Sequence, residues 1–111
     1  WAETISAESI YIGAVQQDSP DYPDCRVEYY EAYNKLVEVG TKPSTNIKVI
    51  TPLLNMSRSE IVKKGIDIAA PLQLSWSCYE RNDKACGCCQ SCRLRLKAFE
   101  EAGFKDKIDY I

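Results

Sequence analysis

Residues 78–92 read CYERNDKACGCCQSC and hold five of the six cysteines of this chain. Cys86, Cys89 and Cys92 form two overlapping C-x-x-C units, and Cys78 lies eight residues upstream of Cys86. A C-x-x-C turn brings two thiolates to one ion, and structural zinc takes four such ligands in a tetrahedron. The chain has no histidine, so sulfur alone must supply them. We therefore expect one structural Zn²⁺ per chain, bound by Cys78, Cys86, Cys89 and Cys92.

The same spacing leaves two other interpretations of these cysteines open. The pattern C-x-x-C-x-x-C also occurs in ferredoxin-type iron–sulfur sites. Six cysteines in a short secreted chain would suggest a disulfide framework. No signal-peptide pattern opens the sequence, so we expect reduced thiols and a cytoplasmic location. Cys88 is left as a spare thiol, because its use as a ligand would give a tighter C-x-C chelate.

The region before the cysteines predicts a strand–helix–strand unit. Residues 9–15 and 47–51 are apolar runs, typical of buried strands in a parallel sheet. Asp24 is a favourable N-cap for a helix predicted over residues 25–39. The buried stripe of this helix is predicted to consist of Tyr29, Tyr33, Leu36 and Val37.

Two further helices are predicted around the cysteine loop. Ser57 and Glu60 form a capping box, which opens a helix that Pro71 ends. The last helix is expected to begin at Ser91 or Cys92 and to end at Gly103. The residues expected on the buried sides of the two helices are Ile61, Val62, Ile66 and Ala69 in the first and Leu96, Phe99 and Ala102 in the second.

The loop DSPDYPDCR, residues 18–26, is the second candidate site. It leaves the carboxyl end of the first predicted strand, and ligands of open α/β sheets bind at that edge. A helix N-terminus favours anions, and Arg26 would add a bidentate donor for a carboxylate or phosphate. Residues 51–53, at the matching end of the second strand, should line the same crevice. On the residues alone, a capped turn with a surface arginine is the commoner explanation.

Composition limits the classes of function. The chain has 111 residues, enough for one domain, and a net charge of −2. This charge argues against general nucleic-acid or membrane binding, so we expect neither as a direct partner. No apolar run reaches 18 residues, so no membrane span is predicted. The oligomeric state stays open, a homodimer included.

Five motifs follow one another along the chain: YPDCR at residues 22–26, TPL at 51–53, SRSEIV at 57–62, WSCY at 76–79 and CGxCxSCRLR at 86–95. In this order they closely resemble the C-terminal half of the 7-cyano-7-deazaguanine synthase family. The resemblance covers nearly the whole chain. Its YPDCR and four-cysteine motifs together are highly specific.

The resemblance implies an α/β fold with a Rossmann-like parallel sheet of the adenine-nucleotide alpha hydrolase type. Residues 1–71 would be the βαβ part of that domain, and residues 72–111 a small helical zinc-binding lobe with the C-terminal helix. The family's reaction uses ATP and ammonia to convert 7-carboxy-7-deazaguanine to a nitrile for queuosine or archaeosine in tRNA. The family's zinc ligands correspond to Cys78, Cys86, Cys89 and Cys92, and its substrate-binding loop corresponds to Asp24, Cys25 and Arg26.

The family's phosphate loop, Ser-Gly-Gly-x-Asp-Ser, does not occur in these 111 residues. We therefore expect the enzyme to be active at full length and this chain alone to be inactive. Two alternatives remain at this point: a zinc-stabilised binding or regulatory module without catalysis, and a related ATP pyrophosphatase that acts on tRNA. A phosphate loop upstream in the intact protein would favour the synthase.

Overall fold

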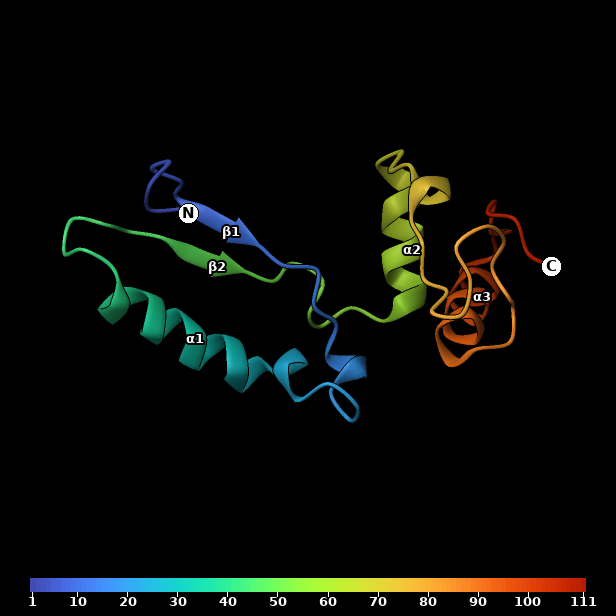
Figure 1. Cartoon of the computed structure of the whole chain (residues 1–111), viewed down its shortest axis with the longest axis horizontal. Coiled ribbons are helices and arrows are strands. Elements are labelled where there is room, and N and C mark those ends of the chain that lie inside the picture. Colours follow the sequence, from blue (N-terminus) through green and yellow to red (C-terminus); the bar gives the residue numbers. More distant parts are fainter. The chain divides into compact units, whose positions relative to one another are not determined.

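Two short parallel strands organise the first part of the chain. In the computed structural model, which describes residues 1–111, β1 (Ser9–Tyr11) pairs with β2 (Lys48–Ile50), and Ile10 lies opposite Val49 (Figure 1). The helix α1 (Val27–Gly40) connects them along the chain. The prediction of an α/β unit with parallel strands is confirmed. Two 3-10 turns, η1 (Gln16–Asp18) and η2 (Pro23–Cys25), lie between β1 and α1.

The strands are shorter and more exposed than predicted. Each has three residues, whereas the apolar runs cover residues 9–15 and 47–51. The side chain of Tyr11 is 70% exposed. The core of this unit lies on the side of α1 and consists of Ala14, Tyr30, Val49 and Leu54, with Ile10, Ile12, Cys25, Val27 and Val37 partly buried against it. The apolar runs therefore located both strands, but they predicted longer and more buried strands than this chain has.

The start of α1 corrects one prediction. Asp24 is not the N-cap: it lies inside η2, whose first residue is Pro23. Arg26 is the residue before α1, with an extended backbone (φ −84°, ψ 151°) and no side-chain capping bond. Pro23 favours a separate turn because its φ is fixed. The extended Arg26 then interrupts that turn before the helix begins.

The rotation of α1 corrects a second prediction. Tyr29, Tyr33 and Leu36 are exposed, and Tyr30 faces the core in their place. Asn34 explains the difference, because its side chain is hydrogen-bonded to the backbone of Val49 in β2. These bonds hold the Tyr30 side of the helix against the sheet.

The second part of the chain is helical. Its elements are α2 (Arg58–Asp67), the 3-10 turn η3 (Leu72–Leu74) and α3 (Gln90–Ala102). The capping box is confirmed, since the Glu60 amide donates to Ser57 Oγ at 3.2 Å and the Ser57 amide to Glu60 Oε2 at 2.7 Å. The helices pack through Val62, Ala98, Phe99 and Ala102, with Leu72 against them.

The inward face of α2 differs in part from the prediction. Val62 is buried as expected, whereas Ile66 and Ala69 are exposed. Ala69 has a left-handed backbone (φ 54°), so α2 ends at Asp67 and the chain turns before Pro71. Gly65 is the second buried residue of α2, and the Leu72 side chain packs closely against it. A Cβ at Gly65 would meet Leu72 at 3.1 Å.

The end of α3 agrees with the prediction. Gly103 follows the helix with φ 82°, the left-handed conformation that glycine adopts without strain. Phe99 and Ala102 are buried, while Leu96 stays 37% exposed.

Two compact units result, residues 1–56 and residues 57–111. The helix α2 belongs to the second unit, where it packs on α3. The domain boundary predicted at residue 71 stays a prediction. None of the helices combines the length and the apolar character that crossing a membrane requires.

Candidate metal centre

Four cysteine sulfurs meet in the second unit. The Sγ atoms of Cys78, Cys86, Cys89 and Cys92 all lie within 4.8 Å of one another. Tetrahedral zinc with Zn–S bonds of about 2.3 Å requires sulfurs roughly 3.8 Å apart. The Cys86 and Cys92 sulfurs are 3.9 Å apart, so the donor set has the size and chemistry that such an ion needs. Cys88 is exposed and outside this group.

Backbone amides point at three of these sulfurs. The amide of Cys86 donates to Cys78 Sγ (3.5 Å), that of Cys89 to Cys86 Sγ (3.3 Å) and that of Cys92 to Cys89 Sγ (3.4 Å). Cys89 is also the N-cap of α3, so its sulfur sits at the positive end of the helix. Hydrogen bonds and helix dipoles of this kind favour thiolates over thiols.

The surroundings lower the pKa of some of the cysteine thiols and raise that of others. The amide of Cys86 is the main reason that the pKa of Cys78 is lowered to about 6. The amide of Cys92 likewise lowers the pKa of Cys89. Burial raises the pKa of Cys92 to about 12, and its side chain is only 1% exposed. A bound cation would remove this last penalty, because a coordinated thiol loses its proton outright.

The loop between the first and second ligands is fixed from both sides. Trp76 Nε1 donates to the carbonyls of Cys78 and Arg81, each at 3.1 Å. Arg81 in turn pairs with Asp83 at 2.7 Å. Gly87 has φ 69°, a conformation that side-chain-bearing residues rarely adopt, and it turns the chain between Cys86 and Cys88.

Residues 106–111 close over the cysteine cluster. The Ala85 amide donates to Asp109 O at 2.8 Å, and the Ile111 amide to Ala85 O at 3.1 Å. Ala85 is fully buried as a result. Ile108 and Tyr110 pack against the cysteines. The C-terminal residues are therefore part of this centre, although no cysteine lies among them.

An ion pair beside the cluster was missed by the sequence analysis. Arg95 donates from Nε to Asp106 Oδ2 (2.5 Å) and from Nη2 to Oδ1 (3.0 Å). Tyr110 also donates to Asp106, at 2.8 Å. Burial acts to raise the pKa of Asp106, but these hydrogen bonds outweigh it and hold the pKa below its usual value.

Arg95 also reaches the segment before the first ligand. It donates to Leu72 O at 3.1 Å and to Ser75 Oγ at 2.8 Å. One sequence signal could have revealed it: Arg95 follows Cys92 by three residues and precedes Phe99 by four, so it lies on the inward face of α3.

The predicted substrate loop lies in the first unit. Cys25 is half-buried and packs against the core of that unit, whereas Asp24 and Arg26 are exposed. The loop at residues 18–26 follows β1, and the segment at residues 51–53 follows β2. The Gln16 amide links these two regions by donating to Leu54 O at 2.8 Å. Both therefore lie beyond the carboxyl ends of the strands, as the sequence predicted.

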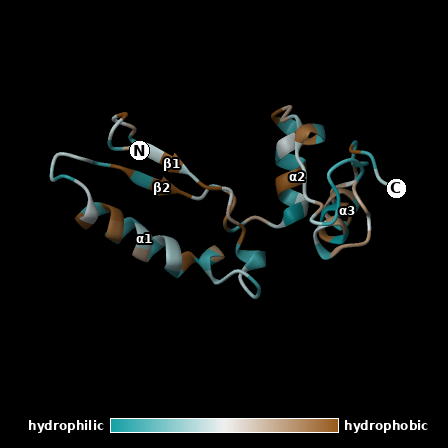
Figure 2. Cartoon of the chain, viewed as in Figure 1, coloured by the Kyte–Doolittle hydropathy of each residue, from teal (hydrophilic) through white to brown (hydrophobic).

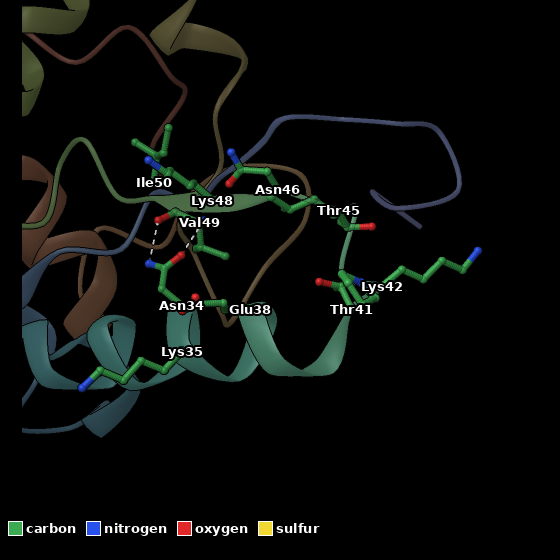
Figure 3. A pocket seen from close by; sticks show the side chains of 12 residues that line it. Asn34, Lys35, Glu38, Thr41, Lys42, Thr45, Asn46, Lys48, Val49 and Ile50 are labelled. Atoms are coloured by element: carbon green, nitrogen blue, oxygen red, sulfur yellow. Dashed lines mark hydrogen bonds between the residues drawn. The ribbon is translucent and has the colours of Figure 1, made fainter.

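A separate groove of about 890 Å³ runs between α1 and β2 (Figure 3). The side chain of Asn34 reaches across to Val49, while Lys35 and Lys42 extend away from one another. These two cations therefore do not converge on one point of the groove. Its lining was not a predicted site, and it does not include Asp24, Cys25 or Arg26.

Comparisons with known proteins agree with the motifs. The family model described as queuosine biosynthesis protein QueC matches residues 1–103. The 7-cyano-7-deazaguanine synthase of Chlorobium phaeobacteroides (strain DSM 266) is 58% identical over 110 residues, which are 99% of this chain and 49% of that protein. The same enzyme of Campylobacter curvus is 56% identical over 109 residues, 98% of this chain and 49% of the relative. The chain spans about half the length of the curated relatives it matches.

The match along residues 1–103 includes all five motifs that carry the resemblance. The four cysteines of the last two motifs converge on one site. The chain belongs to the queuosine biosynthesis protein QueC family.

Proposed function

We propose that this chain forms the C-terminal half of an ATP-dependent 7-cyano-7-deazaguanine synthase. The observation that carries the proposal is the 58% identity to such a synthase along 99% of the chain. The substrates would be 7-carboxy-7-deazaguanine, ATP and ammonia, in a reducing cytoplasm that keeps the thiols free. Both relatives named above are 7-cyano-7-deazaguanine synthases, which favours this function over the two alternatives from the sequence, a non-catalytic module and a tRNA-directed pyrophosphatase.

We further propose that the cysteine cluster holds one structural Zn²⁺. Four sulfurs without a fifth donor make a closed site, the type that stabilises folds rather than binding water for catalysis. Residues 78–92 contribute few apolar side chains to a core, so ligation would supply much of their order. When bound, the ion would hold the loop, the N-terminus of α3 and the residues packed on them.

We propose that Asp24, Cys25 and Arg26 form part of the substrate-binding wall. They follow β1 at the carboxyl edge of a parallel sheet, where ligands of Rossmann-like folds bind. The exposed Arg26 is free to bind the substrate carboxylate through two hydrogen bonds. Asp24 could accept from the purine-like ring. The half-buried Cys25 anchors both to the core.

The parallel pairing of β1 and β2 also supports a Rossmann-like sheet of the adenine-nucleotide alpha hydrolase type. In that arrangement residues 1–71 would belong to the nucleotide-binding domain and residues 72–111 to the zinc-binding lobe.

The experiment that tests the function is an assay of the full-length protein with 7-carboxy-7-deazaguanine, ammonia and ATP. We expect nitrile formation that depends on ATP. Absence of turnover by zinc-loaded, folded protein would refute the synthase proposal. Turnover of a tRNA substrate in its place would favour the pyrophosphatase.

A further inference from the structure

Residues 106–111 cover the cysteine cluster, and we name them the strap. Figure 2 shows hydrophilic residues along the stretch that leads to the C-terminus. Ile108 and Tyr110 are the strap residues that pack against the cysteines. Because the strap contributes few apolar side chains, hydrogen bonds supply most of its attachment to the second unit.

One neighbour of the second ligand, Cys86, is paired with the backbone of the strap. This neighbour is Ala85, whose amide donates to Asp109 O at 2.8 Å. The Ile111 amide donates in turn to Ala85 O at 3.1 Å. Ala85 has no exposed surface, so water cannot replace these two bonds. The strap therefore fixes the backbone on the N-terminal side of Cys86.

The other neighbour of Cys86 lies under an aromatic ring of the strap. A Cβ built at Gly87 would be 3.6 Å from Tyr110 Cδ1, an ordinary packing distance. The Tyr110 hydroxyl donates to Asp106 Oδ2 at 2.8 Å, and Asp106 pairs with Arg95 of α3. The strap thus connects α3 to the residues on both sides of Cys86.

Among the four cysteines, Cys86 is the one that an open strap would free. Cys78 and Cys92 are only 6% and 1% exposed. Cys89 is half-buried, but it is the N-cap of α3 and is held by that helix. Cys86 is also half-buried and belongs to no helix or strand. Once the strap opens, a competing ligand can replace Cys86 before any other cysteine.

We propose that local opening of the strap, with the rest of the second unit folded, controls metal exchange at this centre. The inference rests on the zinc site proposed above. Segments held by few apolar contacts open locally at a much lower free energy than the whole unit. The strap is such a segment, and it holds the backbone on both sides of Cys86. Its opening therefore lets Cys86 move away while α2 and α3 stay packed.

The test is the rate of zinc release from the zinc-loaded protein at its full natural length. The probe is 4-(2-pyridylazo)resorcinol, a coloured zinc chelator, used in excess at several urea concentrations below the unfolding transition. We expect a first-order rate that becomes independent of chelator concentration, because opening precedes ligand exchange. Its urea dependence should be less than about a third of that of global unfolding, because opening exposes little surface.

One pair of variants tests the backbone bond to Ala85. Ile111→Pro removes the amide that donates to Ala85 O, whereas Ile111→Ala retains it. The Ile111 side chain is 72% exposed, so neither change leaves a cavity in a core. Loss of one hydrogen bond should make zinc release about fivefold faster in Ile111→Pro. The rate in Ile111→Ala should equal that of the wild type.

A second pair tests the contact between Tyr110 and Asp106. Tyr110→Phe keeps the ring over Gly87 but removes the donor to the Asp106 carboxylate. A hydrogen bond to a charged acceptor is stronger than a neutral one, so we expect about tenfold faster release. Lys107→Ala is the control, because Lys107 is exposed in the strap and forms no recorded hydrogen bond or ion pair. It should leave the rate unchanged.

Four outcomes would overturn the proposal. A release rate with the full urea dependence of unfolding would mean that metal loss requires the whole unit to unfold. A rate that stays proportional to chelator concentration would mean that the chelator attacks the closed site directly. Equal rates in wild type, Ile111→Pro and Tyr110→Phe would remove the strap from the exchange step. A protein that binds no zinc would refute the proposed metal centre itself, and the role of the strap with it.

Discussion

Asn34 and Val49 exchange two hydrogen bonds across the outer edge of β2. Asn34 Nδ2 donates to Val49 O at 3.0 Å, and the Val49 amide donates to Asn34 Oδ1 at 2.8 Å. The neighbouring Lys48 amide and Ile50 carbonyl face β1 instead, bonding to Glu8 O and the Ile12 amide. The Asn34 amide thus takes the place that a further strand would occupy at this position, so another strand can pair only at β1.

Replacing Asn34 by leucine should destabilise the first unit. Both backbone groups of Val49, which is 6% exposed, would lose their partners. An unsatisfied buried polar group costs about 1–3 kcal/mol, so we expect a loss of roughly 2 kcal/mol or more in urea unfolding. Asn46→Leu is the matched control, because Asn46 is exposed and forms no recorded hydrogen bond. Equal losses in the two variants would contradict the role of the Asn34–Val49 pair.

Metal analysis should return about one zinc per chain, in a colourless protein. Cys89→Ser should lower both zinc content and thermal stability, because Cys89 is a proposed ligand and the N-cap of α3. Cys88→Ser should retain both, since Cys88 lies outside the cluster. A brown protein would instead point to an iron–sulfur centre. If both serine variants lost zinc equally, the ligand set would need to include Cys88.

Arg26→Ala in the full-length protein should reduce nitrile formation while zinc content stays normal. Loss of a charge-assisted hydrogen bond to the substrate carboxylate costs on the order of 2 kcal/mol, about thirtyfold in kcat/KM. Lys63→Ala removes an exposed cation of α2 and serves as the control. Unchanged kcat/KM in Arg26→Ala would remove this loop from the substrate site.

Asp106→Asn should destabilise the second unit by an amount that does not vary between pH 6 and 8. The pKa of Asp106 is lowered in the folded protein, so its contribution is complete above the unfolded value of about 3.9 and is lost as the pH falls through the folded value. Breaking a buried ion pair costs about 3–5 kcal/mol, and the Arg95 and Asp106 side chains are 9% and 2% exposed.

Urea unfolding of both proteins at several pH values measures this difference. Lys97→Ala is the control, because its pair with Glu101 is exposed and contributes little. A difference that shrinks as the pH rises from 6 to 8 would mean that Asp106 titrates there and that its pKa is raised.

Features set by neighbouring residues were predictable from the sequence. Ser57 and Glu60 cap α2 through their own side chains, and Gly103 ends α3 through its own backbone. The cysteine spacing likewise brought the four sulfurs together. Each of these depends on residues within a few turns of one another, and sequence reasoning captures such dependence well.

Features set by distant partners were not predictable in the same way. The rotation of α1 depends on Asn34 meeting a strand 15 residues away. The role of Arg95 was missed because its partner, Asp106, lies beyond the end of α3. The N-cap assigned to Asp24 failed because Pro23 and Asp24 enter a separate turn first. In each case a tertiary contact or a competing local turn decided the outcome.

The bond from Arg95 to Leu72 has a consequence for the entropy of metal binding. It joins residues 23 positions apart, and the ligands Cys78 to Cys92 all lie inside that span. The ligand loop is thus nested within a longer loop that is already closed. Because closing the outer loop removes conformational freedom from the inner one, an ion that arrives later has less disorder to suppress. The affinity for the ion therefore depends on a side chain that is not among its ligands.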